Sequence, residues 1–246
     1  MDRLLYIAMT GAKEAMTAQA INTNNLANAS TVGFRADFQA SLTQQLYGAG
    51  HDSRAYATVT DAGVDFAPGS IMSTGRELDV AVNGDGWIAI QAPDGSEAYT
   101  RAGDLNVDNL GRLTTGAGHP VLGNGGPITI PPYAKLDIAA DGTISLQPLG
   151  QPATTLAVID RLKLVNPDVS DLHKGEDGMI RLKDNEAAVA DASVSLVSAS
   201  LEGSNVNTVQ ALVRMIELAR TYETHIKMMN TAEKNDQASA DMVRLT

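Results

Sequence analysis

Apolar residues near the start of the chain recur at the spacing of one helical face. Leu4, Ile7, Gly11, Ala15 and Ala18 are separated by steps of three or four positions, which is the spacing that brings side chains together on one side of a helix. Several of these residues are small, so a second helix would be able to approach this face closely. The pattern predicts an N-terminal helix that packs against another helix.

A row of asparagines follows this helical pattern at positions 22, 24, 25 and 28. Asparagine is a poor helix former in the interior of a helix, because its side chain competes for the backbone hydrogen bonds. At the edge of a packed helix, however, such a row can hydrogen-bond to neighbouring chains. Gly33 then predicts a break, because glycine adopts backbone angles that end a helix. Residues 34–47 carry Phe38, Leu42 and Leu46 four apart, which indicates either a second helical face or an extended arm.

The C-terminal segment carries a longer apolar stripe. Its members again follow one another at steps of three or four, with charged residues such as Arg214, Glu217 and Arg220 between them; they are Val209, Leu212, Ile216, Ala219, Tyr222, Ile226 and Met229. A narrow stripe of this kind is typical of a two-stranded helical seam. Ser204 or Asn205 is expected to cap the helix. The N-terminal stripe is its natural partner, and an intramolecular coiled coil with no further role is the alternative interpretation.

The middle of the chain reads as strands separated by turns. Residues 78–82 alternate, residues 83–86 (Asn-Gly-Asp-Gly) form a hairpin turn, and residues 87–90 return. Similar turn signals recur about every ten residues with no helical pattern between them. The predicted fold class is therefore α+β: terminal amphipathic helices paired as a coiled-coil-like domain (1–46 and 201–246), an extended connector (47–75) and a central antiparallel all-β domain (76–200).

Composition excludes several classes of function. The chain of 246 residues carries 18 Lys and Arg against 29 Asp and Glu, a net charge of −11. Binding of nucleic acid or of an anionic membrane surface is not expected from this balance. The absence of cysteine excludes disulfides, thiolate catalysis and cysteine-based metal sites. The apolar run at residues 4–9 is too short for a signal-peptide core, and no segment is long enough to insert into a membrane, so no cleaved leader is expected.

Motifs in the chain resemble those of the bacterial flagellar axial proteins of the rod and hook. They are Asn-Asn-Leu-Ala-Asn at 24–28 with Thr-Val-Gly-Phe-Arg at 31–35, Leu-Asp-Val-Ala-Val-Asn-Gly-Asp-Gly-Trp at 78–87, Tyr-Thr-Arg-Ala-Gly-Asp at 99–104 and Leu-Glu-Gly-Ser-Asn-Val-Asn at 201–207. Their order and number make the resemblance specific, and it extends over nearly the whole chain. The opening residues and the short connector are most similar to the FlgF-type members of the proximal rod.

The resemblance implies a structural subunit that polymerises helically. In this family the paired terminal helices form an inner tube around the export channel, and the β domain lies outside. Partners would be other rod subunits, further copies of the chain and the flagellar type III export apparatus. An open helical array needs two different surfaces that fit each other. We place these surfaces on the terminal motifs and stripes, with candidate residues Leu4, Ile7, Gly11, Ala15, Ala18, Asn24, Asn25, Leu26, Asn28, Gly33, Phe34, Leu201, Ser204, Asn205, Val206, Val209, Leu212, Ile216, Ala219, Tyr222, Ile226 and Met229.

The same surfaces have a consequence for the free subunit. Isolated helices gain little stability until they pack against a partner. We therefore expect the ends to be largely disordered in the free monomer and to fold on addition to the growing rod.

Two alternatives remain at this point. One keeps the family but makes the chain a distal-rod or hook-like protein, against which the short connector argues. The other is a secreted β-domain hydrolase or binding module with a carboxylate pair such as Asp79 with Asp85. Most such carboxylates fall in turns, where Asp is favoured for local hydrogen bonding. The four histidines are scattered and the loop at 104–115 ends in Thr115 rather than the Glu that calcium loops require. We expect no enzyme, cofactor or metal.

Overall fold

The fold combines two helices with a β-rich central region. The computed structural model describes residues 4–45, 55–151, 156–175, 177–184 and 186–244. The described chain divides into two compact units. One contains both helices and a β-hairpin, and the other contains residues 30–35 and the β-rich segment 66–205. This architecture confirms the α+β class expected from the sequence, whereas the boundaries of independently folding domains stay a prediction.

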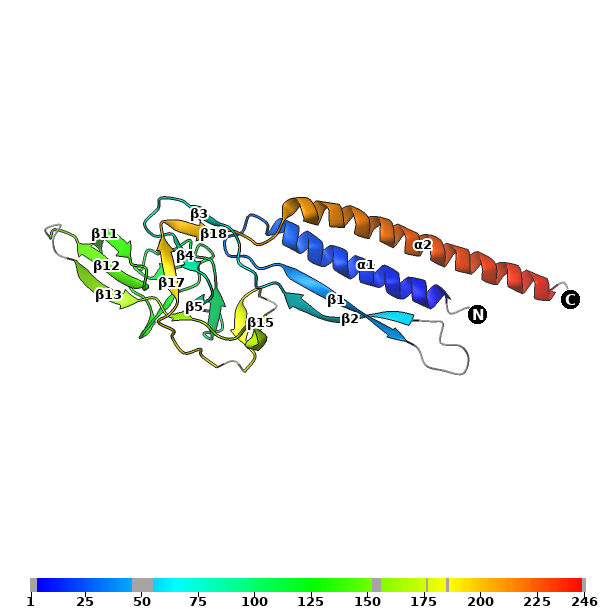
Figure 1. The fold of residues 1–246 in the computed structure, drawn as a ribbon, viewed down its shortest axis with the longest axis horizontal. Helices are drawn as coiled ribbons and strands as arrows, with labels where there is room; N and C mark the ends of the chain where they lie inside the picture. Colours follow the sequence, from blue (N-terminus) through cyan, green and yellow to red (C-terminus); the bar gives the residue numbers. More distant parts are fainter. Residues whose placement is uncertain (1–3, 46–54, 152–155, 176, 185, 245–246) are drawn as a thin grey trace. The chain divides into compact units, whose positions relative to one another are not determined.

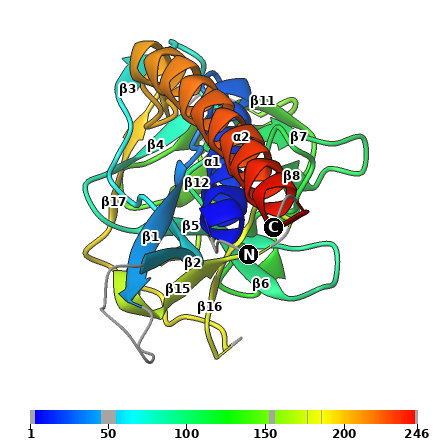
Figure 2. The same ribbon diagram turned by 90° about the vertical axis from the view of Figure 1, so that its right-hand side faces the viewer.

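The first unit is built on a pair of helices. α1 (Leu4–Ala27) and α2 (Thr208–Arg244) lie side by side in Figures 1 and 2. Asn22 of α1 contacts Ala211 early in α2, whereas Gly11 lies under the ring of His225 further along α2. Since the contacts move forward in one helix as they move back in the other, the two helices are antiparallel.

The ends of the two helices test the predicted break after α1 and the predicted cap of α2. α1 ends at Ala27, and Gly33 takes a φ of +67° in the following turn, a backbone conformation that glycine adopts without cost. This confirms the predicted break. Asn207 caps α2, because its side-chain oxygen accepts the backbone N–H groups of Val209 and Gln210 (both 3.1 Å). The expected caps, Ser204 and Asn205, were therefore wrong: they precede the helix by too many residues.

A β-hairpin completes the first unit. β1 (Asp37–Gln45) pairs antiparallel with β2 (Ala55–Val64), with a register shift after Gln39. Of the two interpretations for residues 34–47, the described part is therefore extended; Leu46 and Tyr47 lie outside the described residues. α1 lies between α2 and this hairpin (Figure 1).

The second unit consists of short antiparallel strands. They are β3 (Ile71–Ser73), β4 (Val80–Asn83), β5 (Trp87–Gln91), β6 (Glu97–Thr100), β7 (Asn106–Val107), β8 (Leu113–Thr114), β9 (Leu122–Gly123), β10 (Gly126–Pro127), β11 (Tyr133–Ile138), β12 (Thr143–Pro148), β13 (Ala157–Arg161), β14 (Leu164–Val165), β15 (Leu172–Lys174), β16 (Ile180–Leu182), β17 (Ser195–Ser198) and β18 (Ser200–Glu202), with one short 3-10 helix (Val169–Asp171) before β15. The largest sheet has the order β14-β5-β6-β16-β15, and a second has the order β11-β12-β13.

Two apolar clusters hold the second unit together. The larger one joins β4, β5 and the β11–β12 hairpin through residues such as Val82, Ile88 and Leu146. The smaller one surrounds Trp87, Tyr99 and Ile180. The strands and the turn predicted at 78–90 are confirmed, with Gly84 and Gly86 at positive φ angles (+81° and +125°). The predicted hairpin was wrong, because β4 pairs with β17 whereas β5 pairs with β6 and β14. The strands β3 and β18 pair at the place where the chain enters and leaves this unit.

Candidate assembly interface

Small residues form the contact between α1 and α2. Ala8, Ala12 and Ala15 are buried on α1, and Ala211 and Ala232 are buried on α2. Partly buried residues of α2 fill the interval between these two alanines at alternating steps of four and three: Met215, Leu218, Tyr222, His225 and Met229. A step pattern of this kind keeps one side of a helix turned toward a partner helix. Gly11 permits the closest approach, because a Cβ at this position would lie 2.4 Å from His225 Cε1.

The stripe nominated on α2 divides between two faces. Ala219, Tyr222, Ile226 and Met229 are partly buried, whereas Val209, Leu212 and Ile216 are exposed. The residues of this stripe follow one another at slightly shorter steps along the sequence than the α2 residues that contact α1. The stripe therefore turns gradually around the helix axis, away from the face that contacts α1. Its second half reaches the α1 side, and its first half lies on the outer surface.

The asparagine row makes contacts inside the chain. Asn25 Nδ2 donates to the backbone carbonyl of Asp37 (2.7 Å), and Asn25 Oδ1 accepts the backbone N–H of Asp37 (2.9 Å). Its amide thus pairs with the first residue of β1 as a neighbouring strand would. Asn22 Nδ2 donates to the carbonyl of Ala211 at 2.8 Å. Asn28 donates to the carbonyl of Asn24 one turn earlier, and Asn24 itself is exposed. Two members of the row therefore fix α1 to the hairpin and to α2.

The other nominated residues are placed as follows. Leu4 is the first residue of α1. Ile7, Gly11, Ala18, Leu26, Gly33, Phe34, Leu201, Ser204, Asn205 and Val206 are partly buried, and Ala15 is buried. Gly33, Phe34, Leu201, Ser204 and Asn205 belong to the β-rich unit rather than to the helical unit.

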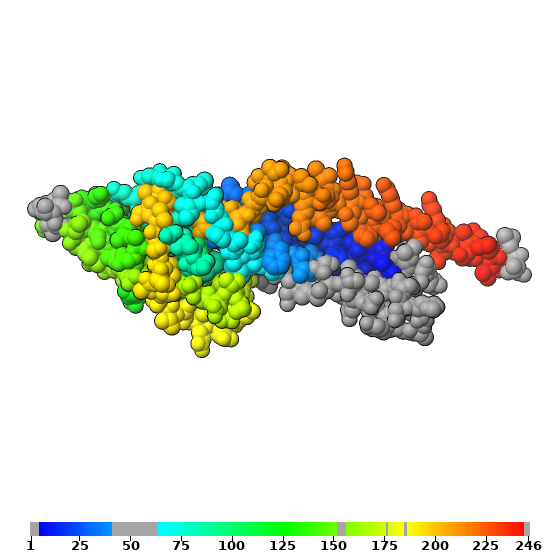
Figure 3. Space-filling model, viewed as in Figure 1, coloured from blue at the N-terminus to red at the C-terminus, as the bar shows by residue number. Residues whose placement is uncertain are grey.

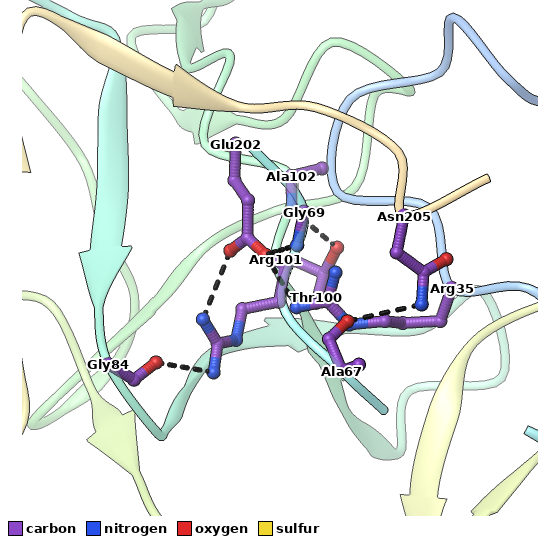
Figure 4. Close-up of polar contacts among 9 residues, drawn as sticks. All are labelled: Arg35, Ala67, Gly69, Gly84, Thr100, Arg101, Ala102, Glu202 and Asn205. Atoms are coloured by element: carbon purple, nitrogen blue, oxygen red, sulfur yellow. Dashed lines mark hydrogen bonds and ion pairs between the residues drawn. The ribbon is translucent and has the colours of Figure 1, made fainter. Parts of the chain in front are cut away.

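A buried carboxylate in the second unit connects the motifs. Glu202 Oε1 accepts from Arg35 Nη2 (2.6 Å) and from the backbone N–H of Gly69 (2.8 Å). Glu202 Oε2 accepts from Arg101 Nη1 (3.0 Å), and Arg101 Nη2 donates to the carbonyl of Gly84 (2.9 Å). Figure 4 shows these side chains converging from separate segments of the chain. The side chains of Glu202 and Arg35 are each only 1% exposed.

The ring of Trp87 lies against both arginines of this cluster. The guanidinium carbons of Arg35 and Arg101 lie 5.6 Å and 5.1 Å from the centroid of its ring, within the range of a cation–π contact. Phe66 meets the same ring edge-on at 5.8 Å. The backbones of the two linking segments also pair, because Gly33 N–H donates to the Glu202 carbonyl (2.8 Å) and Asn205 N–H donates to the Phe34 carbonyl (3.3 Å). Residues from each of the four motif groups quoted above thus meet around Glu202.

The cluster carries an excess of positive charge, since two guanidinium groups share one carboxylate. Burial lowers the pKa of Arg101, while the charge of Glu202 opposes this shift. Nε and Nη1 of Arg35 and Nε of Arg101 are buried without a hydrogen-bond partner, so the ring of Trp87 supplies part of their stabilisation. A second buried group lies nearby: burial raises the pKa of Tyr99 to about 12, and its hydroxyl accepts the backbone N–H of Ala188 at 2.8 Å.

Sequence reasoning nominated neighbours of these residues but not the residues themselves. Arg35, Arg101 and Glu202 lie inside the quoted motifs and were not chosen. The signal that was present is a charged residue within an otherwise apolar or small-residue motif, which indicates a buried ion pair when opposite charges occur in two such motifs. Nothing in the spacing indicates which motifs meet.

Chemistry of other kinds finds no support in the described part of the chain. No cluster of three or more His, Cys, Asp or Glu side chains within it has an arrangement suited to a metal ion. Neither helix, over the residues described, has an apolar stretch long enough to cross a membrane.

Comparison with known proteins identifies the family. The model of the flagella basal body rod protein family matches residues 5–35, that of the flagellar hook protein FlgE/F/G D1 domain matches residues 81–146, and that of the flagellar basal body rod FlgEFG protein C-terminal matches residues 197–242. The flagellar basal-body rod protein FlgF of Escherichia coli (strain K12) is 44% identical over 241 residues, with 96% of each chain covered. The chain belongs to the flagellar basal-body rod protein family.

Other relatives agree with this assignment. FlgF of Salmonella typhimurium is 40% identical over 252 residues, with the whole of both chains covered. FlgG of Bacillus subtilis is 32% identical over 270 residues, with 99% of this chain and 100% of the relative covered. The chain is accordingly a structural rod subunit of the FlgF type. The alternative interpretation, a hydrolase or binding module from outside this family, was wrong. The buried Glu202 cluster therefore joins the N-terminal, D1 and C-terminal segments that these family models match.

Proposed function

We propose that this chain is a subunit of the proximal rod and that it polymerises helically through its terminal helices. The observation that carries the proposal is the full-length similarity to FlgF rod proteins at 44% and 40% identity. The resulting tube would form part of the drive shaft and of the export channel. The distal-rod or hook-like alternative is less well supported, because the segment between residues 46 and 70 is short.

The pairing of α1 with α2 is coiled-coil-like in this proposal. The alternating steps of four and three along α2 and the buried alanines of α1 support it. The second half of the nominated stripe serves this pairing. The first half, Val209, Leu212 and Ile216, remains available to neighbouring subunits.

Export and localisation follow from the same role. The subunit would reach the periplasmic rod through the flagellar type III apparatus, and it would contact other rod subunits and further copies of itself. The proposal assigns no catalytic step, cofactor or metal to the chain.

The free subunit is expected to hold its ends only loosely. Beyond Ala232, residues 233–243 of α2 are exposed, so these last turns gain little from tertiary packing. Amide exchange on the monomer tests this part of the proposal. Strong protection across both 4–30 and 209–230 would contradict it.

The decisive test is electron microscopy of basal bodies from cells that lack this chain, together with a motility assay. Non-motile cells whose particles keep the inner-membrane ring but lack the rod beyond its base are expected. A complete rod and hook in such cells would contradict the proposal, and a rod that stops further out would favour the distal-rod alternative. As a control, the full-length gene restores motility, whereas a chain without residues 1–40 and 210–246 does not.

A further inference from the structure

The chain contains two Asn-Gly pairs, Asn83-Gly84 and Asn124-Gly125. In such a pair the backbone nitrogen of the glycine can attack Cγ of the asparagine side chain. The new N–C bond closes a five-membered succinimide ring and ammonia leaves; water then opens the ring at either carbonyl and gives aspartate or isoaspartate. This reaction makes asparagine a chemically labile residue, and glycine favours it because no Cβ shields its nitrogen. Since both pairs have the same sequence, their surroundings decide which one reacts.

The first pair is fixed on both sides. Asn83 is the last residue of β4 and pairs with Ser195 of β17. Its Nδ2 donates to Ser195 Oγ (3.4 Å). The carbonyl of Gly84 accepts from Arg101 Nη2 (2.9 Å), and Arg101 is only 4% exposed. Ring closure rotates the backbone and the side chain of the asparagine, so at this position it would disrupt both sets of contacts.

The second pair forms the turn between β9 and β10. Gly123 pairs with Gly126, and the two residues between them are exposed. Among the described residues, the side-chain amide of Asn124 makes no hydrogen bond and the backbone N–H of Gly125 donates none. No atom lies within 4 Å of the place where a Cβ of Gly125 would stand. The segment that contains this turn reaches the surface of the β-rich unit, in green in Figure 3. The side chain of Asn124 is therefore free to turn toward the nitrogen that attacks it.

Asp-Gly pairs can close the same ring, but only slowly when the carboxyl is ionised. The chain has four of them: Asp85-Gly86, Asp94-Gly95, Asp141-Gly142 and Asp177-Gly178. In the last three, hydrogen bonds from Ser96, Thr143 and Arg181, respectively, hold the pKa of the carboxyl below its usual range. In the first, Gly86 is packed so closely that a Cβ would lie 2.7 Å from Val194. The structure thus leaves the turn between β9 and β10 as the least constrained of these pairs.

We propose that Asn124 is a site of deamidation in the folded chain, with water as the co-reactant and with aspartate and isoaspartate as the products. The inference goes beyond the rod role and does not depend on it. Both products add a negative charge beside Asp160, whose Oδ1 accepts the backbone N–H of Asn124 (3.4 Å). Like charges repel at this distance, and isoaspartate also adds a methylene to the main chain. The modification therefore loosens the turn between β9 and β10.

Peptide mass spectrometry of the aged full-length chain tests the proposal. Trypsin cleaves after Lys and Arg, so Asn83 falls in the peptide 77–101 and Asn124 in the peptide 113–135. Each peptide contains a single asparagine, so the deamidated fraction of each peptide reports one site. The purified chain is aged in mildly alkaline buffer, and a second sample is aged in guanidinium chloride to give both rates without the fold. Samples digested before ageing correct for deamidation during the digest.

The expected result is that Asn124 deamidates several-fold faster than Asn83 in the folded chain, and that the two rates converge in guanidinium chloride. Gly125→Ala is the matched variant, because its Cβ enters open space and shields the attacking nitrogen. It should slow deamidation of Asn124 several-fold, leave the rate at Asn83 unchanged and keep the circular dichroism of the folded chain.

Three results would overturn the proposal. The first is an equal or faster rate at Asn83 in the folded chain. The second is a rate at Asn124 that is many-fold lower in the folded chain than in guanidinium chloride, since the turn would then protect its asparagine. The third is a difference between the two sites that persists unchanged in guanidinium chloride, since the structure would then not select the site.

Discussion

At the scale of single residues, Glu202 is buried between two arginines in the β-rich unit. Its carboxylate accepts from Arg35, Arg101 and the backbone of Gly69. Removing one member of a buried ion pair leaves the remaining charges without compensation, which commonly costs about 3–5 kcal/mol. The two arginines would then repel each other across the ring of Trp87.

Glu202→Gln is therefore expected to lower the free energy of unfolding by about 3 kcal/mol or more. Trp87 is the only tryptophan of the chain and lies in this cluster, so its fluorescence during denaturant unfolding measures the effect directly. Glu77→Gln is the matched control, because Glu77 and Lys135 form an ion pair whose side chains are 56% and 59% exposed, and such pairs contribute about 0–1 kcal/mol. Equal losses in the two variants would contradict a structural role for the cluster.

Gly33 allows a second test at the same scale. Its φ is +67°, and a Cβ would lie 2.3 Å from the backbone nitrogen of Ala102. Gly33→Ala should therefore combine a conformational penalty of about 1–2 kcal/mol with a clash that only backbone movement relieves. Gly75→Ala isolates the first contribution, since Gly75 has a φ of +74° and open space around it. Thermal unfolding should show a clearly larger loss for Gly33→Ala, and equal losses would rule out the close approach.

Sequence reasoning at this scale found the motifs, but neither the charged residues within them that pair nor the partners of those residues. The motifs around Gly33, Arg101 and Glu202 stand out in the chain, yet the pairing of Arg35 with Glu202 joins residues 167 positions apart. Local composition carries no information about which distant segments meet. Charged residues inside apolar motifs indicate buried pairing only in general.

At the scale of elements, the asparagines of α1 behave as connectors rather than as helix breakers. The side-chain amide of Asn25 pairs with both backbone groups of Asp37, so the first residue of β1, which faces Val64 of β2 on one side, is held by a helix side chain on the other. Loss of two hydrogen bonds from a partly buried backbone should weaken this junction locally before it affects the whole unit.

Asn25→Ala is expected to destabilise the start of β1 by about 1–3 kcal/mol. Measured in the assembled rod, where the terminal helices are expected to be folded, hydrogen exchange of the Asp37 amide should accelerate markedly, because that N–H loses the side-chain oxygen of Asn25 as its acceptor. Asn24→Ala changes the same residue type at an exposed neighbouring position and should leave the exchange of Asp37 unaltered. An unchanged Asp37 amide in Asn25→Ala would show that the junction does not depend on this side chain.

The type of an element was predictable where the spacing of apolar residues fits only a helix or only a strand. It was ambiguous where the same spacing fits both. α1 and α2 follow from repeated steps of three and four. Phe38, Leu42 and Leu46 are four positions apart, which suits a helix but is also an even number and therefore suits one face of a strand. Only the pairing of β1 with β2 decides between these structures. The α2 stripe shows the same limit, because apolar positions on its two faces read as one continuous pattern.

At the scale of the whole molecule, the β-rich unit depends on segments that lie far outside its continuous stretch. Residues 30–35 supply Arg35, the Gly33 N–H and Phe34; Lys174 Nζ lies over the ring of Phe34, 4.4 Å from its centroid. Pairing of β3 with β18 brings Gly69 and Glu202 together at the other boundary. The boundary at 76–200 expected from turn signals would omit all of these groups.

Fragments with different boundaries should therefore differ in stability in a definite order. We expect the fragment 30–205 to be the most stable. The fragment 66–205 keeps Phe66, Gly69 and Glu202 but loses Arg35 with its charge-assisted hydrogen bond, a loss of about 1.5–3 kcal/mol. The fragment 76–200 leaves Arg101 buried without Glu202 and should be the least stable.

Denaturant unfolding followed by Trp87 fluorescence measures all three fragments with the same probe. Arg35→Met in the fragment 30–205 is the control that separates the lost charge from the lost backbone pairing of residues 33 and 34 with 202 and 205. Its stability should fall between those of 30–205 and 66–205. If 76–200 instead unfolds at the same denaturant concentration as 30–205, then the central strands fold alone. The motifs at both ends would in that case serve contacts outside this unit, and the Glu202 cluster would not be what holds those motifs in place.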